Sequence, residues 1–179
     1  MLVLGTTNEG KVRELLELLR PHGIGCRSLA GFADAVEVEE TGVTFAENAA
    51  LKASAQAVAL GAWVLAEDSG LVVPALGGEP GVRSARYSGT AGDRLVVDGR
   101  NNALLLERLR GVADRAAHYA CHAALADPAG RVVAESSGRC HGVLAESPRG
   151  AGGFGYDPLF IVPEYHRTFG EIPAAVKAV

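Results

Sequence analysis

The sequence of 179 residues lacks long hydrophobic runs, and this absence argues against a membrane-spanning helix. A membrane helix needs about 20 consecutive apolar residues, and no segment approaches that length. The first residues, Met1-Leu2-Val3-Leu4-Gly5, also lack the basic segment of a secretory signal peptide. We therefore expect a cytoplasmic protein without a membrane partner.

Basic blocks and paired cysteine motifs are missing as well. The chain has 17 Lys and Arg against 21 Asp and Glu, which gives a net charge of −4 and argues against a nucleic-acid partner. Cys26, Cys121 and Cys140 are far apart and form no CxxC motif, so they fit a reducing compartment better than disulfides or zinc. Because 48% of the residues are hydrophobic, the chain can bury a core, and we expect one domain over residues 1–179.

The amino-terminal segment has the pattern of a strand, a loop and a helix. Leu2-Val3-Leu4 is apolar, and leucines at helical spacing follow as far as Arg20, with Asn8 as the predicted N-cap. The N–H groups at such a helix start can bind a phosphate, and Lys11 would add a charge. The loop lacks the P-loop spacing, and an ordinary βα unit with a surface lysine is the commoner explanation of this pattern.

Two adjacent acids, Glu67 and Asp68, follow the apolar run of residues 62–66 and precede Gly70. This pattern predicts a strand that ends at the acids and a tight turn at Gly70. Carboxylates at the end of a strand would face a cation or a cleft, although a simple polar turn also fits. Adjacent side chains of an extended segment point to opposite faces, so we expect the two acids to have different tasks.

A second acidic segment, residues 37–42, contains Glu40. Three acids in four residues usually mark a solvated loop, but Glu40 together with Asp68 would make a hard-oxygen magnesium site. Thr44 and Glu47 have the spacing of a capping box and predict a helix as far as about residue 60. Lys52 lies on this helix, where it would either pair with a phosphate or extend into solvent.

The second half of the chain predicts a helix over residues 98–109, then a hairpin whose strands are residues 117–126 and 131–143. The segment 150–160 follows, with four glycines in its first six residues and then aromatic residues. Phe154 or Tyr156 could stack on a nucleobase and Asp157 could accept hydrogen bonds from it, which favours a base pocket. A glycine-rich turn with core aromatics is the alternative.

Five blocks, in this order, resemble the inosine triphosphate pyrophosphatase family. The blocks are Thr6-Thr7-Asn8-Glu9-Gly10-Lys11, Glu40-Thr41-Gly42 with Phe45-Ala46-Glu47-Asn48-Ala49, Glu67-Asp68-Ser69-Gly70-Leu71, Pro80-Gly81 with Ser84-Ala85-Arg86-Tyr87-Ser88-Gly89, and Gly153-Phe154-Gly155-Tyr156-Asp157-Pro158. The resemblance implies magnesium-dependent hydrolysis of deaminated purine nucleotides (dITP, ITP, XTP) to the monophosphate and pyrophosphate. It also implies a homodimer with an α/β fold, in which helices flank a long mixed sheet and the active site lies in a cleft between two lobes.

The resemblance assigns roles to individual residues. Asp68 would activate the attacking water and bind Mg²⁺ together with Glu40, and Lys52 would act with Asp68 in catalysis. Lys11 and Lys52 would steady the phosphates, whereas Glu67 would be a second metal contact or a charge at the cleft edge. The remaining substrate-binding residues would be Thr6, Thr7, Asn8, Glu9, Gly10, Ser69, Phe154, Gly155, Tyr156, Asp157 and Lys177.

The family usually carries a Ser-His-Arg block shortly after the lysine that matches Lys177, whereas the printed sequence ends at Val179. We expect the chain to continue into that block, which helps to bind the purine in the family. Two other functions fit the same sequence blocks. One is a pyrophosphatase that acts on modified pyrimidine nucleotides, and the other is a nucleotide-binding module without catalysis.

Overall fold

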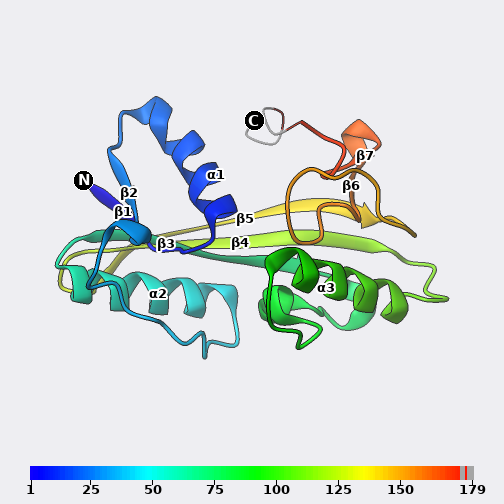
Figure 1. Ribbon diagram of the computed structural model, residues 1–179, viewed down its shortest axis with the longest axis horizontal. Helices are drawn as coiled ribbons and strands as arrows, with labels where there is room; N and C mark the ends of the chain where they lie inside the picture. The colour runs from blue at the N-terminus through cyan, green and yellow to red at the C-terminus, as the bar shows by residue number, and fades with distance from the viewer. Residues whose placement is uncertain (174–175, 177–179) are drawn as a thin grey trace. The chain divides into compact units, whose positions relative to one another are not determined.

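The computed structural model describes residues 1–173 and 176, which form an α/β fold (Figure 1). Within those residues seven strands make one mixed sheet in the order β2-β1-β3-β4-β5-β6-β7. The predicted α/β class, with a mixed sheet and flanking helices, is therefore confirmed. The chain divides into two compact units, unit 1 (residues 1–68 and 121–138) and unit 2 (residues 69–120 and 139–179). The single domain and the cleft between lobes stay predictions.

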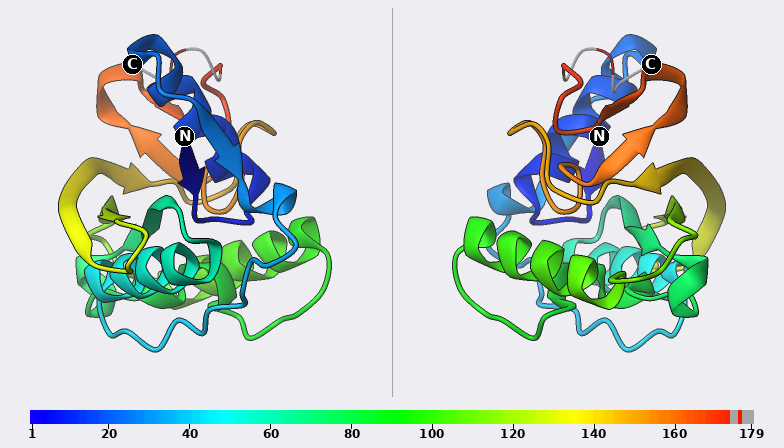
Figure 2. Two further views of the ribbon diagram at one scale, coloured as in Figure 1. Left: turned by 90° about the vertical axis from the view of Figure 1, so that its left-hand side faces the viewer. Right: turned by 90° about the vertical axis from the view of Figure 1, so that its right-hand side faces the viewer.

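Unit 1 is built on parallel strands. β1 (Leu2–Leu4) lies between β2 (Cys26–Ser28) and β3 (Trp63–Val72), with Leu2 opposite both Cys26 and Trp63. The helices α1 (Glu9–Leu19) and α2 (Phe45–Leu60) lie on opposite sides of these strands (Figures 1 and 2). Two short 3-10 helices, η1 (Arg20–His22) and η2 (Leu29–Gly31), follow α1 and β2.

Small side chains bring α2 close to β3. Three alanines of α2, one helical turn apart, share a buried cluster with Val64 and Ala66 of β3; they are Ala49, Ala53 and Ala57. Both predicted helix starts are confirmed. Asn8 Oδ1 accepts a hydrogen bond from the N–H of Gly10 at 3.0 Å, and Thr44 forms a complete capping box with Glu47.

Unit 2 contains α3 (Arg94–Arg108), which begins four residues earlier than predicted. The start is set by Asp93, whose Oδ1 accepts from the N–H of Leu95 at 2.9 Å. The strands β6 (Phe160–Val162) and β7 (Arg167–Thr168) are antiparallel and form the orange hairpin in Figure 2. The 3-10 helices of this unit are η3 (Pro74–Leu76), η4 (Gly81–Arg86) and η5 (Pro163–Tyr165).

The strands β4 (Ala116–Ala126) and β5 (Val132–Leu144) form the predicted hairpin to within one residue at each end. Asp127 sets the turn, because its Oδ1 accepts from the N–H groups of Ala129 and Arg131, both at 3.0 Å. Among the helices of residues 1–173 and 176, none combines the length and the apolar character that crossing a bilayer requires.

Candidate active site

The two adjacent acids lie inside β3 and not at its end. β3 continues from Trp63 through Glu67 and Asp68 to Val72, so the predicted turn at Gly70 is wrong. A Cβ at Gly70 would lie 2.3 Å from Ser84 Oγ and 2.7 Å from the carbonyl oxygen of Gly81. Glycine is therefore required because η4 packs directly against the strand, and no reversal of the chain is involved.

Asp68 belongs to a buried charged cluster with two residues from the α2 side. Lys52 Nζ lies 2.7 Å from Glu40 Oε1 and 3.1 Å from Asp68 Oδ1. Asp68 is only 6% exposed, and burial raises its pKa; the ammonium of Lys52 opposes this rise, and the carboxylate of Glu40 adds to it. Burial alone would lower the pKa of Lys52, but the two carboxylates outweigh burial and raise it. The structure thus brings together the three residues that the sequence assigned to metal binding and catalysis.

Asn48 connects this cluster to the acidic loop, a role that the sequence analysis did not assign. Its Nδ2 donates to Asp68 Oδ2 at 3.2 Å, and its Oδ1 accepts from the N–H of Gly42 at 2.8 Å. A Cβ at Gly42 would lie 2.6 Å from that same Oδ1, so glycine permits the approach. In the sequence the signal is a polar residue on an alanine-rich helix, and the structure shows that this residue is fully buried. Such a residue needs hydrogen-bond partners.

Glu67 has different partners on the α1 side of β3. Lys11 Nζ lies 2.7 Å from Glu67 Oε1, and Cys121 Sγ donates to Glu67 Oε2 at 3.7 Å. Burial, with the adjacent Glu67 carboxylate adding to it, raises the pKa of Cys121 to about 12. The two acids thus have different partners, as expected from the alternation of side chains along a strand: Lys11 pairs with Glu67, and Lys52 pairs with Asp68. Their separate tasks stay a prediction.

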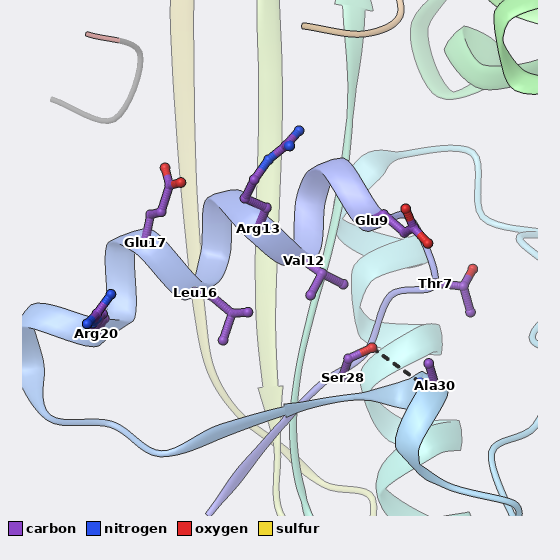
Figure 3. Close-up of a pocket in the computed structure, with 9 residues that line it drawn as sticks. All are labelled: Thr7, Glu9, Val12, Arg13, Leu16, Glu17, Arg20, Ser28 and Ala30. Atoms are coloured by element: carbon purple, nitrogen blue, oxygen red, sulfur yellow. Dashed lines mark hydrogen bonds between the residues drawn. The ribbon is translucent and has the colours of Figure 1, made fainter. Parts of the chain in front are cut away.

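The residues from Thr7 to Lys11, at the end of the loop and the start of α1, have two different surroundings. Lys11 reaches Glu67, whereas Thr7 and Glu9 line a pocket of about 420 Å³ (Figure 3). Figure 3 shows Val12 and Leu16 of α1 pointing towards β2 and η2, with Arg13 and Glu17 pointing away from them. Among the described residues, the pocket lining includes none of the cluster formed by Glu40, Lys52 and Asp68. The pocket is therefore separate from the charged cluster.

The aromatic glycine loop, residues 153–157, lies in unit 2. Tyr156 is buried, and its hydroxyl donates to the carbonyl of Ser84 at 2.9 Å, whereas Phe154 is only half-buried. Asp157 Oδ2 accepts from the N–H of Phe154 at 3.0 Å, and Tyr119 Oη donates to Asp157 Oδ1 at 3.3 Å. The ring of Tyr156 thus belongs to the core, and Phe154 is the more accessible of the two aromatic side chains.

Three predicted substrate residues remain to be placed. Thr6 Oγ1 accepts a hydrogen bond from the N–H of Asn8 at 3.2 Å. Ser69 follows Asp68 in β3 and is half-buried. Lys177 lies outside the described residues. Their contacts with substrate stay predictions.

The donor set of the cluster fits a hard divalent cation. Glu40 Oε1 and Asp68 Oδ1 both lie within 3.1 Å of one point of positive charge, the Nζ of Lys52. Mg²⁺ is typically held by one or two carboxylates, with substrate phosphates and waters completing the shell. In the part of the chain that the structure describes, no group of three or more His, Cys, Asp or Glu side chains is arranged to hold a metal alone. These two carboxylates therefore suit a metal that arrives with phosphate oxygens.

The chain is similar to known proteins in both sequence and structure. The model of the Ham1 family matches residues 2–179. A dITP/XTP pyrophosphatase of Rhodopirellula baltica is 51% identical over 178 residues, which cover 98% of this chain and 84% of that protein. A HAM1 protein structure from Coxiella burnetii has a TM-score of 0.86 and 38% identity, and the match covers 98% of this chain and 88% of that one. This chain belongs to the Ham1 family.

Proposed function

We propose that this protein hydrolyses deaminated purine nucleoside triphosphates (dITP, ITP and XTP) to the monophosphate and pyrophosphate, with Mg²⁺ as cofactor. The observation that carries the proposal is the convergence of the Glu40 and Asp68 carboxylates on Lys52 in a buried position. Membership of the Ham1 family supports it, as do relatives about half identical in sequence that are named dITP/XTP pyrophosphatases.

In this proposal Asp68 is the general base. Burial raises its pKa towards neutrality, which makes the carboxylate a stronger proton acceptor than an exposed aspartate. Asp68 takes a proton from water as the water oxygen bonds to the α-phosphorus. The bond from the α-phosphorus to the bridging oxygen of the β-phosphate then breaks, and pyrophosphate leaves. Asn48 and Lys52 hold the two oxygens of Asp68 in a fixed orientation.

Glu40 and Asp68 would hold the magnesium ion. When bound, the ion supplies charge neutralisation at the phosphate oxygens and lowers the pKa of bound water. Lys52 already lies between these carboxylates, so it can shift towards phosphate oxygens while remaining near both acids. Its raised pKa keeps it positively charged for that task.

Substrate binding would involve the segment at the start of α1 and the aromatic glycine loop. At the start of α1 the positive end of the helix dipole favours phosphate oxygens, while the N–H groups of Gly10 and Lys11 donate to Asn8 Oδ1. Ser69 would contact the phosphates beside Asp68. Phe154 would stack on the base, and the carboxylate of Asp157 would accept a hydrogen bond from the base. A 6-oxo purine would be selected because adenine leaves buried polar groups unpaired.

The test is pyrophosphate release from dITP and dATP with and without Mg²⁺, extended to XTP, dUTP and dTTP. We expect turnover of dITP and XTP that requires Mg²⁺, and loss of that turnover in Asp68→Asn by a factor of about 10²–10⁴. Equal or better turnover of the pyrimidine nucleotides would favour a pyrimidine pyrophosphatase. Nucleotide binding without any pyrophosphate release would favour a non-catalytic module.

Three further properties belong to this proposal. We expect a homodimer, which light scattering at several protein concentrations would detect. We also expect a cytoplasmic location and no affinity for nucleic acid, which fractionation of cells and a DNA-binding assay would check.

A further inference from the structure

Two side chains of α3 hold a single residue of the aromatic glycine loop, Gly155. Asp98 Oδ2 accepts from the N–H of Gly155 at 2.8 Å, and Asn102 Nδ2 donates to the carbonyl of Gly155 at 3.0 Å. Asp98 and Asn102 are four residues apart, so they lie on the same face of the helix. Because one bond ends on the N–H and the other on the C=O, Gly155 is fixed at both of its polar groups.

The surroundings of Asp98 make it a strong acceptor. Asp98 is 8% exposed, and its other carboxylate oxygen, Oδ1, pairs with Arg94 Nε at 3.0 Å. The arginine compensates the buried charge and leaves Oδ2 for Gly155. A hydrogen bond to a charged acceptor is stronger than one between neutral groups, so this contact holds the loop firmly.

The side chain of Asn102 leaves one of its polar atoms without a hydrogen-bond partner. Its Oδ1 is buried and has no hydrogen-bond partner within the described residues. An unsatisfied buried acceptor is unfavourable, and an apolar side chain would avoid the penalty. The amide is therefore explained by its Nδ2 donor, whose acceptor is the carbonyl of Gly155.

Gly155 has the backbone that this arrangement requires. Its φ is +60°, in the left-handed region, and a Cβ there would meet no atom within 4 Å. Glycine is thus needed for conformation and not for space. The side chains assigned to the base lie close to Gly155 in the chain, because Phe154 precedes it and Asp157 follows two residues later. Asp157 Oδ2 also accepts from the N–H of Phe154.

We propose that Asp98 and Asn102 are positioning residues for nucleobase recognition. They do not touch the substrate; they hold Gly155 and thereby place the ring of Phe154 and the carboxylate of Asp157. A loop already fixed in its binding conformation loses less entropy when the base binds. The inference rests on the proposed function, because the loop's contact with the base is part of that proposal.

The first experiment measures steady-state kinetics of Asn102→Asp and Asp98→Leu with dITP and dATP. Asn102→Asp places a carboxylate oxygen against the Gly155 carbonyl, and Asp98→Leu removes the acceptor at similar size. We expect KM for dITP to rise about tenfold in Asp98→Leu, the change typical for loss of one charge-assisted hydrogen bond, and by a similar factor in Asn102→Asp, where two oxygens repel each other; kcat should stay within about twofold. The preference for dITP over dATP should fall in parallel. Asp98→Asn keeps an acceptor oxygen, so its KM for dITP should stay close to the wild-type value.

Leu106→Ala is the matched control for both variants. Leu106 lies on the same helix and packs against the unit 2 core, so the change weakens α3 without altering a bond to Gly155. We expect this variant to lower the unfolding midpoint while KM and the base preference stay unchanged. A rise in KM equal to that of Asn102→Asp would show that any weakening of α3 suffices, and would overturn the inference.

The second experiment needs no nucleotide. Arg149 lies just before the glycine segment, and trypsin cleavage after it reports opening of this part of the chain. We expect Asn102→Asp and Asp98→Leu to be cut there several times faster than wild type and than Leu106→Ala, well below the unfolding midpoint. An inactive wild-type protein would overturn the proposed function. An active wild type whose two variants keep both KM and cleavage rate would overturn this inference alone.

Discussion

Replacing Lys52 with methionine tests the electrostatics of the Asp68 cluster. Methionine keeps the length and apolar stem of the side chain but removes the ammonium that lies 2.7 Å from Glu40 and 3.1 Å from Asp68. Two unit charges 4 Å apart interact by about 4 kcal/mol at an effective dielectric constant of about 20. The side chains of Lys52 and Asp68 are only 15% and 8% exposed, so solvent screens this pair weakly. Removal of one partner of a buried pair costs about 3–5 kcal/mol, and we expect a loss of that size in unfolding free energy at pH 8.

The loss should depend on pH in a defined direction. Burial raises the pKa of Asp68 above its ordinary value, so the folded protein takes up a proton at higher pH than the unfolded chain does. Without the opposing charge of Lys52, the pKa of Asp68 rises further. The loss of unfolding free energy in Lys52→Met is therefore complete well above this raised pKa. It shrinks as the pH falls through the raised pKa towards the ordinary carboxyl range, where Asp68 is protonated in both the folded and the unfolded protein.

Urea denaturation followed by circular dichroism at pH 8, 6 and 4.5 measures both effects. Arg100→Met is the control, because Arg100 is exposed on α3 and its replacement should change the unfolding free energy by no more than about 0.5 kcal/mol. The reasoning would be refuted if Lys52→Met lost less than about 1 kcal/mol at pH 8. A loss of the same size at all three pH values would refute the assignment to Asp68.

Three other predictions address separate features. Gly70→Ala places a Cβ 2.3 Å from Ser84 Oγ and should lower the unfolding free energy by about 1–3 kcal/mol in urea titrations; unchanged stability would contradict the close packing of η4. Thr44→Ala removes the side-chain cap of α2 and should cost about 0.5–2 kcal/mol, while Thr44→Ser should retain most of the stability. The pKa of Cys121 is raised to about 12, so iodoacetamide at pH 8 should alkylate it much more slowly than glutathione; mass spectrometry that finds equal rates would disprove the thiol's protonated state.

Local signals in the sequence predicted those parts of the fold that depend on neighbouring residues. Asn8 and the pair of Thr44 and Glu47 bond to N–H groups within three or four residues, so their spacing alone defines the helix starts. The β4–β5 turn is set in the same way by Asp127. The start of α3 was missed because Leu95 and Val96 after Asp93 are exposed and gave no core-facing pattern.

Features that depend on distant residues could not be predicted. Gly70 looked like a turn because the sequence does not show that η4 packs against it. The convergence of Glu40 and Lys52 on Asp68 came from the family resemblance, since a strand and a helix start leave their relative placement open. Asn48, Asp98 and Asn102 were overlooked because each bonds to a partner 20 or more residues away.

The position of Glu67 and Asp68 side by side within β3 limits how this gene segment can change. Each acid meets its own lysine only because the strand alternates its side chains between the α1 and α2 sides. A deletion or insertion of one residue between Trp63 and Glu67 would exchange the two acids between these sides, while leaving the composition of the strand almost intact. The length of this strand is therefore under stricter constraint than many of its individual side chains.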